Sequence, residues 1–230
     1  MATPAAAVTC ENVSYLNHSY TACEVDVTTD DLRLFHTDDK GDVIGSFEGI
    51  ADLPGVGAVH FAMNAGMYHD DRSPVGHYVE DGIETMRVIT NAGPGNFGLL
   101  PNGVLCINDD SVQVYETLRF VQDAPGCRDA TQSGPMLVID GALHPRFLVD
   151  STSRFVRNGV GVKADQQNAV FVISNDAVSF HEFGSFFRDY LKVPNALYFD
   201  GKVSRLYAPG LGRSDFGFKL GPMVAVIDED

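Results

Sequence analysis

Apolar and polar positions alternate over many short stretches of this chain, and turn residues separate one stretch from the next. A period of two is typical of β-strands that bury one face. Turn dipeptides such as Asp81-Gly82 and Asp140-Gly141 stand between or after these stretches. The pattern predicts strands at Ala22–Val27, Leu32–His36, Val59–Met63, His77–Glu80, Ile83–Ile89, Gly103–Ile107, Val112–Tyr115, Met136–Ile139, Val160–Val162, Val170–Ser174, Ala196–Phe199 and Met223–Ile227.

One segment shows the longer period of a helix. Ser179, with Glu182 three residues later, forms a capping-box pattern, and Pro194 disfavours helix beyond Val193. The apolar residues between them fall at spacings of three and four and give one stripe: Phe180, Phe183, Phe187, Tyr190 and Leu191. We expect a prominent amphipathic helix over about residues 180–192 and a weaker helix near Phe47–Leu53.

Many strands, one long helix and no regular strand-helix alternation predict a single α+β domain with mixed or antiparallel sheets. No apolar run approaches the roughly 18 residues of a membrane span. The first seven residues are small and uncharged, which resembles the remainder of a trimmed export signal; a frayed N-terminus is the alternative. We therefore expect an N-terminal extension over residues 1–19 and the domain over residues 20–230.

The formal net charge is -15, and a field of that sign repels phosphate backbones, so we expect no nucleic-acid partner. A calcium loop needs acidic residues on alternate positions around a glycine. The adjacent aspartate pairs of this chain lack that spacing: Asp30-Asp31, Asp38-Asp39, Asp70-Asp71 and Asp109-Asp110. The histidines also lack metal-ligand spacing. We expect neither a metal nor a cofactor.

The four cysteines form no Cys-x-x-Cys pair, which gives little support for zinc. An even number suits two disulfide bonds in an exported protein, whereas a cytoplasmic protein would keep four free thiols. Cys10 and Cys23 flank a polar segment of hairpin length, and we favour a bond between them.

Four apolar strands run into polar corners that contain glycine. Glycine lets backbone N–H groups approach a ligand closely, and corners that converge can bind anions. Amide, hydroxyl, guanidinium and carboxylate groups at these corners suit a phosphate-bearing or sugar-like ligand. The corners are FAMNAGMY (61–68), ATQSGPMLVIDG (130–141), RNGVGV (157–162) and NALYFDGKVS (195–204).

Each of these residues also has a simpler interpretation. Asp200-Gly201 is a common turn, and Arg157 alone is typical of a surface ion pair. Ser133 has no Gly-x-Ser-x-Gly context, which argues against a serine hydrolase. The order of all four corners carries more weight than any one of them.

That order resembles the phosphodiester glycosidase family. The family pattern runs from an Asn-Gly-Gly corner through Ser-Gly-Gly-Pro and Arg-Thr-Ala-x-Gly to a helix and Asn-Leu-Asp-Gly-Gly-x-Ser. Here the corresponding stretches start at Asn64, Ser133, Arg157 and Tyr198, and the resemblance spans roughly residues 58–206. Lys202 stands where the family keeps a second glycine, and Asn158 stands where it keeps threonine.

The resemblance implies a hydrolase that cleaves a sugar-1-phosphodiester on its glycosidic side. It makes Asp200 the catalytic carboxylate, with Arg157 and Ser133 on the phosphate and Asn64 on a sugar hydroxyl or the phosphate. The second carboxylate common in glycosidases has no clear counterpart. The expected substrate-binding residues are Asn64, Gly66, Ser133, Gly134, Arg157, Asn158, Gly201 and Ser204.

A second hypothesis comes from another functional class. The same corners could bind a phosphorylated glycan without cleaving it, as a non-catalytic periplasmic protein. Under either hypothesis the partner is a phosphorylated sugar or glycan, and we expect an exported protein, periplasmic or extracellular. Turnover of a sugar-phosphodiester separates the two.

Overall fold

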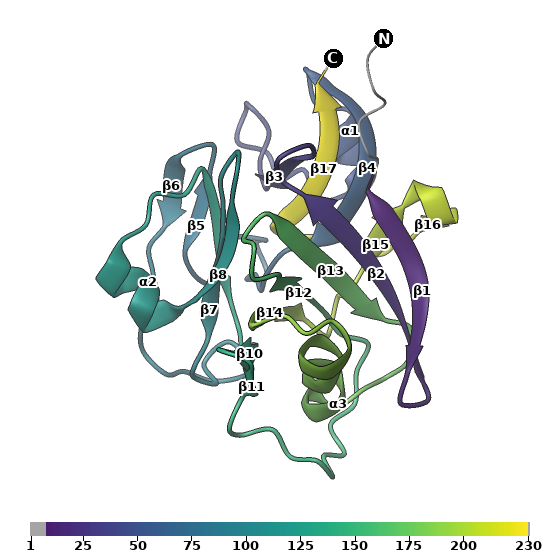
Figure 1. Cartoon of the computed structure of the whole chain (residues 1–230). Helices are drawn as coiled ribbons and strands as arrows, with labels where there is room; N and C mark the ends of the chain where they lie inside the picture. The colour runs from purple at the N-terminus through teal and green to yellow at the C-terminus, as the bar shows by residue number, and fades with distance from the viewer. Residues whose placement is uncertain (1–7, 230) are drawn as a thin grey trace.

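The computed structural model describes residues 8–229, which form three antiparallel sheets with short helices (Figure 1). Strands hold 42% of the residues and helices 12%, so the protein is mostly β and the expected α+β class is wrong. All the strands expected from the alternating pattern are present, with shifts of a few residues at their ends.

The first sheet has seven strands. It includes two hairpins, over residues 9–26 and 158–174. Thr9–Tyr15 pairs with His18–Asp26 inside it, so residues on both sides of the expected boundary at residue 20 share one hairpin. The division into an extension and a domain stays a prediction. The strand order is β1 (Thr9–Tyr15), β2 (His18–Asp26), β13 (Asn168–Ser174), β12 (Asn158–Val162), β14 (Asn195–Asp200), β10 (Met136–Ile139) and β11 (Ala142–Leu143).

The second and third sheets have five strands each. The second runs β16 (Arg213–Ser214), β15 (Leu206–Ala208), β4 (Val56–Asn64), β17 (Met223–Glu229) and β3 (Asp31–Phe35). The third runs β6 (Ile83–Met86), β5 (Tyr78–Glu80), β9 (Asp129–Ser133), β7 (Gly103–Ile107) and β8 (Val112–Glu116).

One large hydrophobic core lies between the three sheets. Each sheet contributes alternate residues to it, such as Phe171 from the first, Phe61 from the second and Leu105 from the third. The residues between them point outward, where each sheet buries them under a short helix. Several strands are therefore buried on both faces, whereas the alternating pattern had indicated one buried face.

The covering helices are α1 (Phe47–Ala51) on the second sheet, α2 (Thr117–Asp123) on the third and α3 (Phe180–Ser185) on the first (Figure 1). A single turn of 3-10 helix, η2 (Pro209–Leu211), follows β15. None of the helices in residues 8–229 is long and apolar enough to cross a membrane.

The expected helix over residues 180–192 is shorter than its pattern suggested. The capping box of Ser179 and Glu182 is present, but the α-helix ends at Ser185. A π-helix, η1 (Phe186–Tyr190), continues it and closes with a bond from Leu191 N–H to the Phe186 carbonyl. The wider turn buries Phe186 and Phe187 together and leaves Tyr190 46% exposed, so the regular stripe is interrupted.

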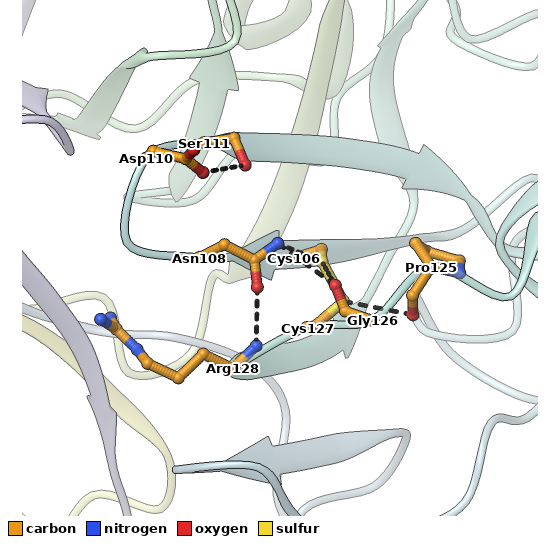
Figure 2. Close-up of a disulfide and its surroundings, with 8 residues drawn as sticks. All are labelled: Cys106, Asn108, Asp110, Ser111, Pro125, Gly126, Cys127 and Arg128. Carbon is orange, nitrogen blue, oxygen red and sulfur yellow. Dashed lines mark hydrogen bonds between the residues drawn. A yellow bond between two sulfur atoms is a disulfide. The ribbon is translucent and has the colours of Figure 1, made fainter.

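Two disulfide bonds join neighbouring segments. The predicted bond between Cys10 and Cys23 is confirmed and links β1 to β2. Figure 2 shows the second bond, in which Cys106 of β7 is joined to Cys127 after α2. Beside it Asn108 donates to the Gly126 carbonyl over 3.2 Å and accepts from Arg128 N–H over 2.9 Å. Each bond therefore joins a buried residue of a core strand to a more exposed segment beside it.

Candidate active site

A cleft of about 390 Å³ opens beside the ends of β4 and β14. This volume suits a small ligand. The lining residues come from the loop between β6 and β7, the segment after β4, the end of β14 and Phe155 before β12. The lining residues are Met67, Tyr68, Val75, Pro94, Gly95, Asn96, Phe97, Phe155, Tyr198, Asp200, Gly201 and Lys202.

Asp200 is the one carboxylate among these lining residues of the described chain. Its Oδ1 accepts hydrogen bonds from the backbone N–H groups of Gly201 (2.6 Å) and Lys202 (2.9 Å). Its Oδ2 has no hydrogen-bond partner within residues 8–229. Burial raises the pKa of Asp200, against the lowering effect of the two N–H groups and of the Lys202 charge. One oxygen therefore anchors the carboxylate and leaves the other available to a ligand.

Asn158 holds the backbone of Asp200 in place from behind the cleft. Its Oδ1 accepts from Asp200 N–H over 3.1 Å, and its Nδ2 donates to Asn64 Oδ1 over 3.0 Å. Asn64 Oδ1 also accepts from Arg205 N–H, so it has two donors. Both amide side chains are fully buried. The hydroxyl of Ser204 lies 2.9 Å from the Asp200 carbonyl and 3.3 Å from Asn158 Oδ1.

A β-bulge occurs next to Asp200. Asn158 pairs with Asp200 and Gly159 with Tyr198, which leaves Phe199 without a partner in β12. The hydroxyl of Ser133 donates to the Phe199 carbonyl over 3.0 Å. Bulges redirect side chains and are frequent near active sites. Here the bulge turns Asp200 toward the cleft, and Ser133 satisfies the carbonyl that the ladder leaves free.

Arg157 lies behind Tyr198 and is only 1% exposed. Its three guanidinium nitrogens lie within hydrogen-bond distance of the Val178 carbonyl (2.8 Å), the Tyr198 hydroxyl (3.3 Å) and the Ser153 carbonyl (3.1 Å). The ring of Phe180 stacks 3.7 Å from its central carbon. The guanidinium supports the Tyr198 wall, and burial lowers the pKa of Arg157.

Three glycines allow close packing around the cleft. A Cβ on Gly201 would lie 2.2 Å from the Tyr198 hydroxyl, and one on Gly134 would lie 2.6 Å from Asn102 Cβ and 3.2 Å from the Phe97 carbonyl. A Cβ on Gly66 would lie 3.0 Å from Thr131 Oγ1. A side chain at any of these positions would crowd the walls, and the roles of the three glycines toward a ligand stay predictions.

Of the residues expected from the sequence, Asp200 and Gly201 line the cleft. Asn64, Ser133, Asn158 and Ser204 gather behind the Asp200 turn, and their roles toward a ligand stay predictions. The aromatic wall, including Phe97 of the loop over residues 91–98, was not among the residues expected from the sequence. The run NAGPGNFG there is rich in glycine between two strands, and this signal could have found it.

Another hollow, lined by Arg33 and Arg128 among others, offers less to a ligand. Its cations are already paired, Arg33 with Asp31 and Arg128 with Asp109. Within residues 8–229, no cluster of three or more His, Cys, Asp or Glu side chains is arranged to hold a metal ion.

Comparison with known proteins identifies relatives of the chain. The sequence model of the phosphodiester glycosidase family matches residues 57–216. An uncharacterized protein of Escherichia coli K12, YigE, is 33% identical over 190 residues, which cover 82% of this chain and 74% of YigE.

Two solved structures are similar in fold. One is the catalytic domain of zebrafish N-acetylglucosamine-1-phosphodiester alpha-N-acetylglucosaminidase auto-inhibited by its pro-peptide, with a TM-score of 0.60, 11% identity, and coverage of 96% of this chain and 82% of that one. The other is a hypothetical protein from Synechocystis, with a TM-score of 0.60, 14% identity, and coverage of 96% and 61%. At these identities the likeness shows the fold alone.

Proposed function

The chain belongs to the phosphodiester glycosidase family, and from that membership we propose that it hydrolyses a sugar-1-phosphodiester on its glycosidic side. Family and fold together support a glycan-processing hydrolase. The name of the zebrafish enzyme specifies an N-acetylglucosamine-1-phosphodiester, which supports the class of linkage. The sugar in the substrate of this chain is left open by the proposal.

The observation that carries the proposal is the carboxylate of Asp200. It lies in a cleft of ligand size, in the motif that the family shares, and its Oδ2 has no partner in the described chain. Its raised pKa makes it a stronger base than an exposed aspartate. A carboxylate held this way is suited to proton transfer.

In the proposed reaction Asp200 takes a proton from a water that attacks the anomeric carbon. The water oxygen bonds to that carbon, and the bond from the carbon to the phosphate oxygen breaks. The electron pair leaves with the phosphate, which becomes a monoester, while the sugar gains a hydroxyl. A phosphate ester is a weakly basic leaving group, so it needs less protonation than an alcohol, which fits a cleft with one lining carboxylate.

Hydrolysis of methyl esters of several sugar-1-phosphates in ¹⁸O-labelled water tests the reaction. Cleavage on the glycosidic side places the label in the free sugar, whereas cleavage of a phosphorus–oxygen bond places it in the phosphate. We expect the label in the sugar. Label in the phosphate, or tight binding of every ester without turnover, would contradict the proposal, and the second result would favour the non-catalytic glycan-binding hypothesis.

Asp200→Asn tests the role of the carboxylate. We expect kcat to fall by roughly 10²–10⁴, the usual contribution of a general acid-base group, with substrate affinity nearly unchanged. Asp140→Asn is the matched control, since Asp140 also precedes a glycine in a turn but lies exposed beside Arg119. Equal activity of the two variants would remove Asp200 from the mechanism.

The two disulfide bonds support an exported location, periplasmic or extracellular, because thiols stay reduced in the cytoplasm. Mass spectrometry of protein purified from its native host without reductant tests this part of the proposal. We expect all four cysteines to resist alkylation, and free thiols at Cys10 and Cys23 would count against export.

A further inference from the structure

The arginines of this protein divide into two groups by their partners. Most form salt bridges with a carboxylate: Arg33, Arg119, Arg128, Arg154, Arg188 and Arg213. Among the others in residues 8–229, Arg87 and Arg146 are exposed to water. Arg72, Arg157 and Arg205 are at least partly buried without a carboxylate partner. With a net charge of -15, acidic groups are abundant, so unpaired buried cations need an explanation.

Arg205 is the clearest case. It is 8% exposed, and its Nη2 donates to the Phe218 carbonyl. Its Nε is shielded from solvent and has no hydrogen-bond partner in the described chain. A buried donor without an acceptor destabilises the fold, because the group has lost its hydrogen bonds to water. A ligand that supplies an acceptor would recover that loss.

Arg72 lies in the loop after β4 and contacts Tyr68. Its central carbon lies 5.4 Å from the centre of the Tyr68 ring, and its Nη1 donates to the Asp70 carbonyl over 2.6 Å. Its Nε is also buried and unpartnered within residues 8–229. The backbone of Arg72 is left-handed, with φ of 76°.

Tyr68 connects both guanidinium groups to the cleft. It lines the cleft that contains Asp200, and its ring is packed against Gly221. Burial raises the pKa of Tyr68 and the charge of Asp200 raises it further, while Arg72 and Arg205 lower it. The hydroxyl of Tyr68 therefore lies within electrostatic reach of both arginines and of Asp200.

We propose that Arg72 and Arg205 form an anion subsite beside Tyr68 that holds the phosphate group of the substrate. The identity of this ligand rests on the proposed function, whereas the subsite rests on the two unpaired guanidinium groups. Guanidinium groups bind phosphate oxygens through paired, charge-assisted hydrogen bonds. Arg157 is less suited, since all three of its nitrogens already have acceptors.

Calorimetric titration of the whole chain with inorganic phosphate, and separately with a sugar-1-phosphate, tests the subsite. We expect Arg72→Gln and Arg205→Gln each to weaken phosphate binding by about tenfold or more, and Arg205→Lys to recover part of that loss. Arg87→Gln is the control, because Arg87 is exposed and forms no salt bridge within residues 8–229. The phosphate affinity of this variant should equal that of the wild type. A melting curve identifies any variant that unfolds. If Arg205→Gln unfolds, the phosphate affinity of Arg72→Gln, at the half-buried position, decides whether the subsite exists.

The outcomes separate this inference from the proposed function. Phosphate binding that depends on Arg72 and Arg205, in a protein that hydrolyses no phosphodiester, supports the subsite and contradicts the function. Hydrolysis with an unchanged KM and phosphate affinity in both glutamine variants overturns the subsite and leaves the function standing. Failure of the wild-type protein to bind phosphate at millimolar concentration also overturns the subsite.

Discussion

The side-chain oxygen of Asn158 accepts a hydrogen bond from the backbone N–H of Asp200 over 3.1 Å. This bond ties the start of β12 to the end of β14, where the bulge at Phe199 interrupts their ladder. Asn158 is joined on its other side to Asn64 at the end of β4. The first and second sheets are therefore joined directly behind the candidate carboxylate.

Asn158→Ala should affect both stability and catalysis. The change leaves Asp200 N–H and the Asn64 amide nitrogen without their acceptor, which should lower the free energy of unfolding by about 2–4 kcal/mol. The freed turn should also lower kcat more than it raises KM. Asn168→Ala on the neighbouring strand loses one exposed bond to Asp165 and is the control. Equal melting temperatures for the two variants would show that the hydrogen bonds of Asn158 contribute little to stability.

Gly201→Ala should disturb the cleft by overpacking. The new Cβ would lie 2.2 Å from the Tyr198 hydroxyl, and the buried ring cannot move far because Arg157 and Phe180 pack against it. We expect a loss of about 1–3 kcal/mol in unfolding free energy and at least tenfold in kcat/KM. Gly210→Ala has open space around the new Cβ and should match the wild type. Thermal melts and initial rates check both variants.

Arg157→Met distinguishes a structural cation from a phosphate ligand. The substitution removes the donor of the Ser153 carbonyl and one of the two donors of the Val178 carbonyl, so we expect the free energy of unfolding to fall by about 2–4 kcal/mol. Phosphate affinity, measured by calorimetry on the folded fraction, should stay within about twofold. The sequence-based hypothesis that Arg157 holds the phosphate requires the reverse: weaker binding with an unchanged melt.

Glu80 should make stability depend on pH. Burial raises its pKa from the ordinary 4.5 to about 7, despite a hydrogen bond from the Tyr78 hydroxyl, and Asp129 adds to the rise. The folded chain then binds more protons than the unfolded chain between these two values. Unfolding free energy should therefore fall as pH rises through that window, by roughly 1–3 kcal/mol from this group.

Glu80→Gln should remove that part of the pH dependence and should raise stability at pH 7 and above. Denaturant titrations at intervals from pH 4.5 to pH 8 measure it as the difference from wild type. Glu48→Gln, at an exposed position at the start of α1, should leave the wild-type profile unchanged. If the unfolding free energy of Glu80→Gln depends on pH as that of the wild type does, Glu80 is already ionised in the folded protein across this range.

The sequence predicted those parts of the fold that bury apolar side chains. It missed β9 because Thr131, Gln132 and Ser133 are buried yet polar, and hydrogen bonds rather than hydrophobicity hold them. It also missed α2, a short helix with an N-cap at Glu116 and one large buried side chain, Phe120. The α+β class was wrong because one apolar stripe was taken for a long helix.

The candidate site was only partly accessible from sequence. Asp200 stood out through its motif. The two asparagines were harder to interpret, because an amide at a glycine corner can bind either a ligand or another amide, and Asn64 and Asn158 bind each other. Arg72 and Arg205 lie outside the corner residues. What distinguishes them from the other arginines within residues 8–229 is a buried Nε without a hydrogen-bond partner, and only the folded chain reveals this.

The position of β17 has a consequence for the order of events during biosynthesis. β17 lies between β4 and β3 in the second sheet, although both of those strands precede it by most of the chain. Until the ribosome has made β17, β3 has no partner in this sheet and one edge of β4 stays open. Open strand edges invite pairing with other chains. We expect the nascent polypeptide to need protection of this edge, by a chaperone or by delayed folding, until its last strand is inserted.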